Sequence, residues 1–150
     1  MKGFRRLMRR WLHEHGAATD PSSPDTALLG RTYAIPFDRV WEAALGLASR
    51  RQWKVIEADD REGRIVAEAR NIWFRADDDV RIRVRLDANA QTRIDMESTT
   101  RNRAGDLGVN RRRVRRFMKR LDGRVGATPT LILDGTMSEE ITAASVARGS

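Results

Sequence analysis

The stretch VRIRVRL, residues 80–86, alternates strictly between apolar and basic side chains. A period of two is typical of a β-strand with one buried face and one face in water. The run TRIDMES, residues 92–98, repeats the alternation after a short loop. Pairing Leu86 with Thr92 sets opposite charges against each other: Arg83 against Asp95, and Arg81 against Glu97. Such cross-strand pairs stabilise a sheet by about 0.2–1 kcal/mol each, so we expect an antiparallel pair whose charged face is solvated.

An arginine-rich helix is predicted after this strand pair, over residues 110–121. Four apolar residues recur at i, i+3, i+4 and i+7, which is typical of a helix with one face packed on a sheet. They are Val114, Phe117, Met118 and Leu121. We expect Asn110 to be the N-cap of this helix and Gly123 to be its left-handed C-terminal cap.

The residues before the first strand pair predict the rest of the fold. A short strand is expected at residues 32–35, and Pro36 favours the start of a helix over residues 37–51. Residues 53–58 and 64–70, joined by the turn sequence DDREG, are typical of a β-hairpin. The order β-α-β-β-β-β-α predicts an α+β two-layer sandwich, in which a mainly antiparallel sheet of about five strands carries both helices on one face.

The two ends of the chain differ from this central part. Residues 1–15 predict a basic amphipathic helix, because apolar residues fall on one stripe and arginines fill the other face. The stripe consists of Phe4, Leu7, Met8, Trp11 and Leu12, our candidate membrane contacts. Residues 16–30 are predicted to be a linker, 31–125 the folded domain and 126–150 a tail, in which residues 131–133 are expected to add an edge strand.

The positive charge is concentrated in one segment. The chain has 29 Lys and Arg against 21 Asp and Glu, a net charge of +8. Residues 98–124 contain ten basic and two acidic side chains, so the remainder of the chain is neutral. Such an excess favours an anionic partner: a lipid surface, a small anionic ligand or a nucleic acid. The absence of cysteine excludes disulfides and thiol nucleophiles, and we expect a cytoplasmic protein.

The loop before the last predicted helix is the candidate anion-binding site. Glycines let its backbone expose amide N–H groups, and the start of a helix adds a partial positive charge. The candidate residues are Arg101, Asp106, Gly108, Asn110, Arg111 and Arg112. The alternative is a structural loop, in which Asp106 and Asn110 cap the helix and one arginine bridges to the acidic run 77–79. That run is interpreted as a partner for arginines and not as a metal site, since the fixed spacing of a calcium loop is absent. We assign no metal and no cofactor.

Three classes of function remain open. The first is a non-enzymatic binding or scaffold domain, held at the inner face of an anionic membrane by residues 1–15. The second is binding of the nucleic-acid phosphate backbone by the helix at residues 111–120, whose exposed face lacks stacking aromatics and base-reading Asn or Gln. The third is an enzyme acting on an anionic small molecule, with Asp106 as base. No Ser-His-Asp spacing or glycine-rich phosphate loop is present, so we assign no catalytic residue and favour a binding domain.

Two motifs resemble a known family. Thr100-Arg101, followed by Asp106-Leu107-Gly108-Val109-Asn110 and an arginine-rich helix, is similar to the bacterial and plant family of domains of unknown function numbered 1499. The run from Phe74 to Val80 resembles a second element of that family. The resemblance covers residues 31–125 and departs from the family pattern at Ala76 and Arg103. It implies the limits of the domain and the position of the site, but no reaction.

Overall fold

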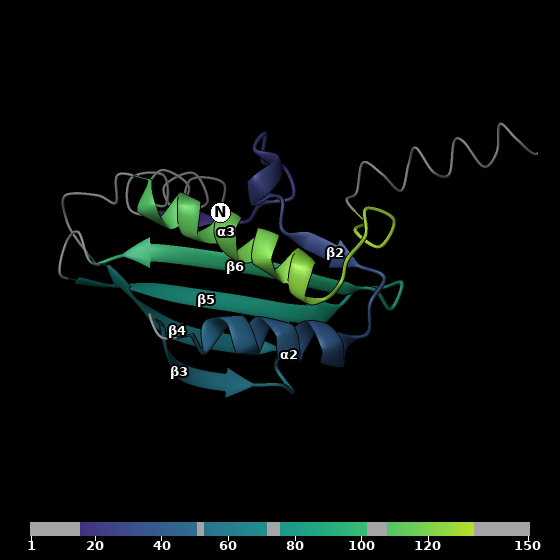
Figure 1. Cartoon of the computed structure of the whole chain (residues 1–150), viewed down its shortest axis with the longest axis horizontal. Helices are drawn as coiled ribbons and strands as arrows, with labels where there is room; N and C mark the ends of the chain where they lie inside the picture. Colours follow the sequence, from purple (N-terminus) through teal and green to yellow (C-terminus); the bar gives the residue numbers. More distant parts are fainter. Residues whose placement is uncertain (1–15, 51–52, 72–75, 102–107, 134–150) are drawn as a thin grey trace, which may run out of the picture.

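The computed structural model describes residues 16–50, 53–71, 76–101 and 108–133, and these form one sheet with two helices on one face (Figure 1). The elements in chain order are β1 (Gly16–Ala18), the 3-10 helix η1 (Thr26–Leu28), β2 (Arg31–Tyr33), α2 (Phe37–Ala48), β3 (Trp53–Asp59), β4 (Arg64–Asn71), β5 (Ala76–Leu86), β6 (Thr92–Thr100) and α3 (Val109–Arg124). The predicted α+β class and the two helices of the domain are confirmed. The helix predicted at residues 1–15 lies outside the described residues, and no described helix is long and apolar enough to cross a membrane.

The sheet is antiparallel throughout, with the strand order β1-β6-β5-β4-β3. β2 also pairs with β6, so β1 and β2 share one edge of that strand. The predicted register of β5 and β6 is confirmed, because Arg83 pairs with Asp95 and Arg81 with Glu97. The sheet has six strands, one more than expected, because β1 adds a strand that the sequence did not indicate.

The prediction that residues 16–30 are a linker is wrong. Residues 16–18 pair with residues 97–99 of β6, and η1 packs against α3. A three-residue strand has too few positions to show a period, and the prolines and serines that follow gave the segment the composition of a linker. The folded domain therefore begins before Arg31. In the tail, Ile132 forms the expected extra pairing, as a single bridge to Tyr33.

Glycine is required at the turn between β3 and β4. Gly63 has φ +62, and a Cβ atom there would stand 1.8 Å from the carbonyl oxygen of Val84. The close approach lets the backbone of β5 bond to the turn, since the amide of Val84 donates to Gly63 O at 2.8 Å. The DDREG sequence thus makes a turn that also holds the neighbouring strand.

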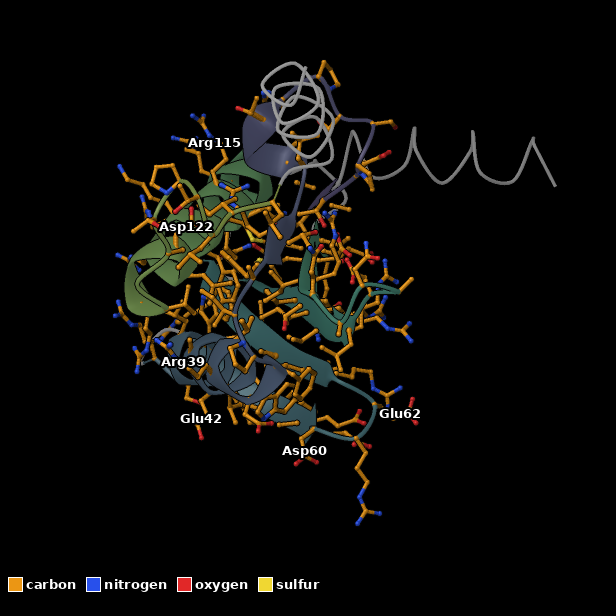
Figure 2. All side chains as sticks on the ribbon, turned by 90° about the vertical axis from the view of Figure 1, so that its right-hand side faces the viewer. Arg39, Glu42, Asp60, Glu62, Arg115 and Asp122 are labelled. Carbon is orange, nitrogen blue, oxygen red and sulfur yellow. The ribbon has the colours of Figure 1, made fainter. Side chains whose placement is uncertain are left out.

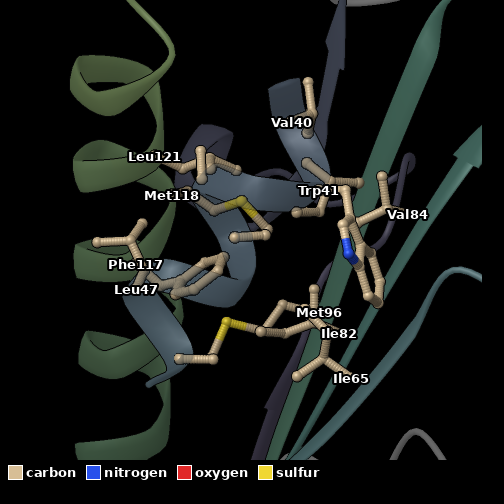
Figure 3. Close-up of a cluster of buried hydrophobic side chains, with 14 of the residues drawn as sticks. Val40, Trp41, Leu47, Ile65, Ile82, Val84, Met96, Phe117, Met118 and Leu121 are labelled. Carbon is tan, nitrogen blue, oxygen red and sulfur yellow. The ribbon is translucent and has the colours of Figure 1, made fainter. Parts of the chain in front are cut away.

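The core lies between the sheet and the two helices (Figure 3). The apolar residues of the two alternating strands and of the predicted helix stripe are buried in it: Val80, Ile82, Val84, Ile94, Met96, Val114, Phe117, Met118 and Leu121. α2 contributes Val40, Trp41 and Leu47 from its inward face. Trp53 of β3 stacks on Phe117 of α3, with ring centroids 5.8 Å apart. This core fixes α3 with one face on the sheet and the opposite face in solvent.

Candidate functional site

The start of α3 is built differently from the prediction. Gly108 is the N-cap, with φ +79, and no side chain caps the helix. The prediction of Asn110 as N-cap is therefore wrong. Asn110 lies four residues before Val114, on the face that packs against the sheet, and it is fully buried. Its Oδ1 atom accepts hydrogen bonds from Ser98 Oγ at 2.6 Å and from Arg113 Nη1 at 2.5 Å.

A buried ion pair joins α3 to the sheet next to this asparagine. Arg113 Nη1 lies 2.8 Å from Asp78 Oδ2, and it also donates to Ser98 Oγ at 3.0 Å. The Asp78 side chain is 0% exposed and that of Arg113 is 11% exposed. Water screens the attraction between these two charges little. The attraction therefore offsets part of the free energy that burial of each charge costs. This is the bridge between an arginine and the acidic run 77–79 that the structural alternative required.

Arg101 makes a second set of ion pairs, at the surface. Its guanidinium donates to Asp79 at 2.6 and 3.1 Å and to Glu68 at 2.9 Å. The hydrogen bond to Asp79, and then the one to Glu68, raise the pKa of the Arg101 guanidinium above its usual value. Asp79 and Glu68 are neighbours in the register of β4 and β5, so one arginine bridges two strands. The Arg101 cation is thus shared between two carboxylates at this corner of the sheet.

The first turn of α3 is also occupied by contacts within the chain. Arg111 donates to Asp25 Oδ2 through Nε at 2.9 Å and through Nη2 at 2.5 Å. Arg112 Nε donates to the carbonyl of Gly108 at 3.4 Å. Sequence reasoning did not find Asp25 because it lies 86 residues away, in the segment that was interpreted as a linker. Asp106 lies outside the described residues.

The next two turns of α3 present cations that the described part of the chain leaves without ion pairs. They are Arg115, Arg116, Lys119 and Arg120, all exposed. None of the four takes part in a side-chain hydrogen bond or salt bridge with a described residue. Their spacing of one, three and one puts them on one side of the helix, within about 8 Å along its axis. Figure 2 shows Arg115 pointing into solvent from the helical layer. We call these four residues the cationic face of α3.

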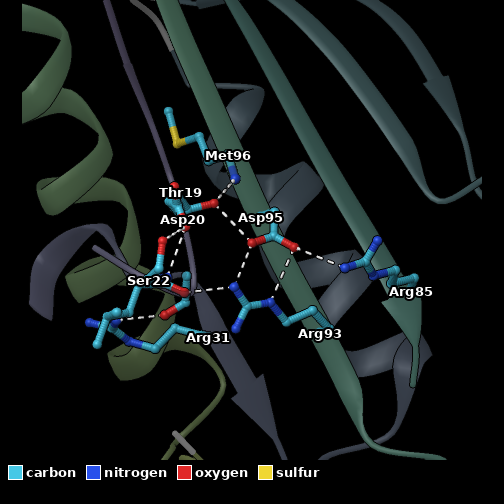
Figure 4. A network of polar contacts seen from close by, with 10 residues as sticks. Thr19, Asp20, Ser22, Arg31, Arg85, Arg93, Asp95 and Met96 are labelled. Atoms are coloured by element: carbon cyan, nitrogen blue, oxygen red, sulfur yellow. Dashed lines mark hydrogen bonds and ion pairs between the residues drawn. The ribbon is translucent and has the colours of Figure 1, made fainter. Parts of the chain in front are cut away.

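The other face of the sheet is different, because its arginines stand beside carboxylates. Arg93 Nη2 lies 2.7 Å from Asp95 Oδ1, and Arg85 Nη2 lies 3.6 Å from Asp95 Oδ2 (Figure 4). Arg81 Nη1 is 4.0 Å from Glu97 Oε1. Thr19 Oγ1 also donates to Asp95, which fixes the chain after β1 on this network. The charged ladder predicted from the sequence is therefore largely compensated within the sheet.

The described residues include no group of three or more His, Cys, Asp or Glu side chains that could hold a metal ion. The candidate membrane contacts Phe4, Leu7, Met8, Trp11 and Leu12 lie outside the described residues. The row of permanent cations on α3 can attract phosphate or carboxylate groups by charge and by charge-assisted hydrogen bonds.

These features define a small two-layer α+β domain whose last helix is cationic on its solvent side. The chain belongs to the family described as protein of unknown function DUF1499, which matches residues 14–121. The match includes β1 and η1, in agreement with their place in the fold. No curated protein and no solved structure matches the chain.

Proposed function

We propose that this domain is a non-enzymatic binding module that docks on an anionic membrane surface through the cationic face of α3. The observation that carries the proposal is the contrast between two sets of basic side chains. Arg101, Arg111 and Arg113 bind carboxylates of the chain itself, whereas the four residues of the cationic face have no such partner among the described residues. Uncompensated cations on a fixed helix attract anionic headgroups at about 1 kcal/mol for each Lys or Arg near the surface.

The residue types on α3 favour a membrane over a nucleic acid. Stacking of bases needs exposed aromatic rings, and readout of bases needs Asn or Gln at the contact. Along α3 the aromatic residue Phe117 is buried in the core, and the amide of Asn110 is buried beside Ser98. The exposed side chains of α3 are mainly cationic, and an anionic bilayer offers negative charge over a wide area. Residues 1–15, with their predicted amphipathic stripe, are expected to add apolar contacts to the same surface.

Cosedimentation with vesicles that contain anionic phospholipid tests the proposal. One variant removes three charges from the cationic face, by Arg115→Gln, Arg116→Gln and Arg120→Gln. Its matched control removes three arginines from the open face of the sheet, by Arg81→Gln, Arg83→Gln and Arg85→Gln, and has the same net charge. At about 1 kcal/mol for each charge, the first variant should bind roughly 100-fold more weakly at low salt. The control should stay close to the wild type.

Three results would contradict the proposal. An equal loss in both variants would show that binding follows net charge and not this face. Unchanged binding by the first variant would move the contact to another part of the chain. The third result is that vesicles bind none of the three proteins, while duplex DNA binds the wild type and the control but not the first variant. That result would assign the cationic face to nucleic acid.

Binding of the wild type to vesicles should also weaken as salt rises from about 0.1 M to 1 M, because the Debye length falls from about 10 to about 3 Å.

A further inference from the structure

β3 is the last strand of the sheet on the side away from β1 (Figure 1). One of its edges pairs with β4, and no described strand pairs with the other. An open edge is a row of backbone N–H and C=O groups that pairs readily with a further strand. Trp53 and Val55 of β3 are only partly buried against the core, and Ile56 is 52% exposed. Within the described part of the chain, this edge therefore leaves apolar surface and backbone hydrogen-bonding groups open to a partner.

The register of β3 with β4 places each side chain of β3 on one face of the sheet. Residues that stand opposite each other in an antiparallel pair share a face. Trp53, Val55 and Ala58 stand opposite buried residues of β4, so they lie on the face that the helices cover. Lys54 and Glu57 stand opposite the residues of β4 that alternate with these buried ones, so they lie on the open face.

A bulge makes this order of faces the same in both directions along β3. The register shifts between Val55 and Glu57, so Ile56 is an extra residue without a counterpart on β4. A second β3 can run antiparallel to the first, with a two-fold axis between residues 55 and 56. Trp53 of each copy then meets Ala58 of the other on the helical face, and Val55 meets Ile56. Without the extra residue, the same alignment would bring side chains of opposite faces together.

The open face of this strand pair carries complementary charges. In the same alignment, Lys54 of each copy lies opposite Glu57 of the other, and the two-fold axis makes this contact twice. Lys54 forms no ion pair with a described residue, while Glu57 pairs with Arg64 and keeps its side chain 45% exposed. Charges and bulges on an edge oppose pairing with most strands. A second copy of β3 has the complementary charge at each position and the same bend at the axis, so these features select it.

We propose that the domain forms a symmetric dimer through β3, in which the sheets of two copies join edge to edge. The two-fold axis of an antiparallel strand pair is perpendicular to the sheet, so the helices of both copies cover the same face of the joined sheet. Both cationic faces of α3 then point to one side, where a single anionic surface engages the two copies together. The dimer itself does not rest on the proposed function.

Exchange of charges tests the dimer and its alignment together. Lys54→Glu or Glu57→Lys alone sets like charges against each other at both contacts, so each variant should dimerise on the order of 10- to 100-fold more weakly than the wild type. A one-to-one mixture of the two variants brings opposite charges together again, and its dimer should have a Kd close to that of the wild type. A double variant with both changes in one chain should also dimerise like the wild type. Sedimentation equilibrium over a range of protein concentrations measures each Kd.

Three results would overturn the proposed dimer. The first is a wild type that stays monomeric up to the limit of its solubility. The second is a wild-type dimer whose Kd is the same in both single variants, because the contact then lies elsewhere. The third is a loss in the single variants that neither the mixture nor the double variant restores, because Lys54 and Glu57 then do not face each other. Vesicles take no part in these measurements, so each of these results leaves the proposed function standing.

Discussion

Removing the cation from the buried pair should destabilise the domain far more than removing one from an exposed pair on the same helix. Arg113 lies 2.8 Å from Asp78, whose side chain is 0% exposed. The change Arg113→Gln removes the cation that lies against this buried carboxylate, which costs about 3–5 kcal/mol. Small domains are stable by about 5–15 kcal/mol, so this change consumes a large share of the free energy of unfolding.

The matched control is Arg111→Gln, two residues earlier on α3. Arg111 is 57% exposed and pairs with Asp25 at the surface, where such pairs contribute about 0–1 kcal/mol. Its positive charge in the first turn also opposes the helix dipole, at a cost of about 0.3–1 kcal/mol, so the two effects nearly cancel. Urea unfolding followed by circular dichroism measures both variants. A free energy of unfolding that falls equally in the two variants would refute the reasoning.

A double variant separates the ion pair from general damage to the core. The changes Arg113→Gln and Asp78→Asn together remove both charges and leave polar groups of similar size. Because each single change removes the same attraction between Arg113 and Asp78, the double variant should be less destabilised than the sum of the two single changes. Additive losses would show that packing, and not charge, holds this end of α3.

Two further changes test the packing and the backbone. Phe117→Ala removes a side chain that is 4% exposed and stacked on Trp53, and it should lower the free energy of unfolding by about 3–5 kcal/mol. A melting temperature within a degree or two of the wild type, on the order expected for a surface change, would show that this face of α3 is not in the core. Gly63→Ala should destabilise the domain much more than Gly108→Ala, because both glycines have positive φ but only at Gly63 would a Cβ atom meet a backbone oxygen, at 1.8 Å. In thermal melts, the Gly108→Ala variant reports backbone strain alone, and the Gly63→Ala variant reports strain plus the clash with Val84 O. Equal melting temperatures of the two variants would contradict this account of the turn.

The central strands could be predicted from the sequence because two independent signals agree there. The alternation at residues 80–86 fixes which side chains face the core, and the opposite charges on the outer face fix the pairing partners. A shift of the pairing by one residue would point the apolar side chains into water, so few registers of β5 against β6 are compatible with a buried core. β1 lacked both signals, since it has three residues and no charge.

The site could be predicted only in part. Asp78 has the same phase as Val80, so extending the alternation by two residues would have placed it inside the fold; the carboxylate made that extension look unfavourable. Asn110 was assigned to a cap by its residue type, while its spacing from Val114 already put it on the buried face. The pairing of Arg111 with Asp25 follows from tertiary structure alone, because no local pattern links residues so far apart.

The position of β6 also orders events during synthesis. β1 and β2 leave the ribosome early, yet their partner residues in β6 are made about sixty to eighty positions later. At roughly 5–20 residues per second, the nascent chain waits on the order of 3 to 16 seconds before these partner residues are made. Thr19–Asp25, next to β1, contains only polar residues and two prolines, so this part of the waiting segment exposes few apolar side chains. β1 and β2 can therefore join the sheet only after β6 has been made, so the earliest described residues of the domain are among the last to be fixed.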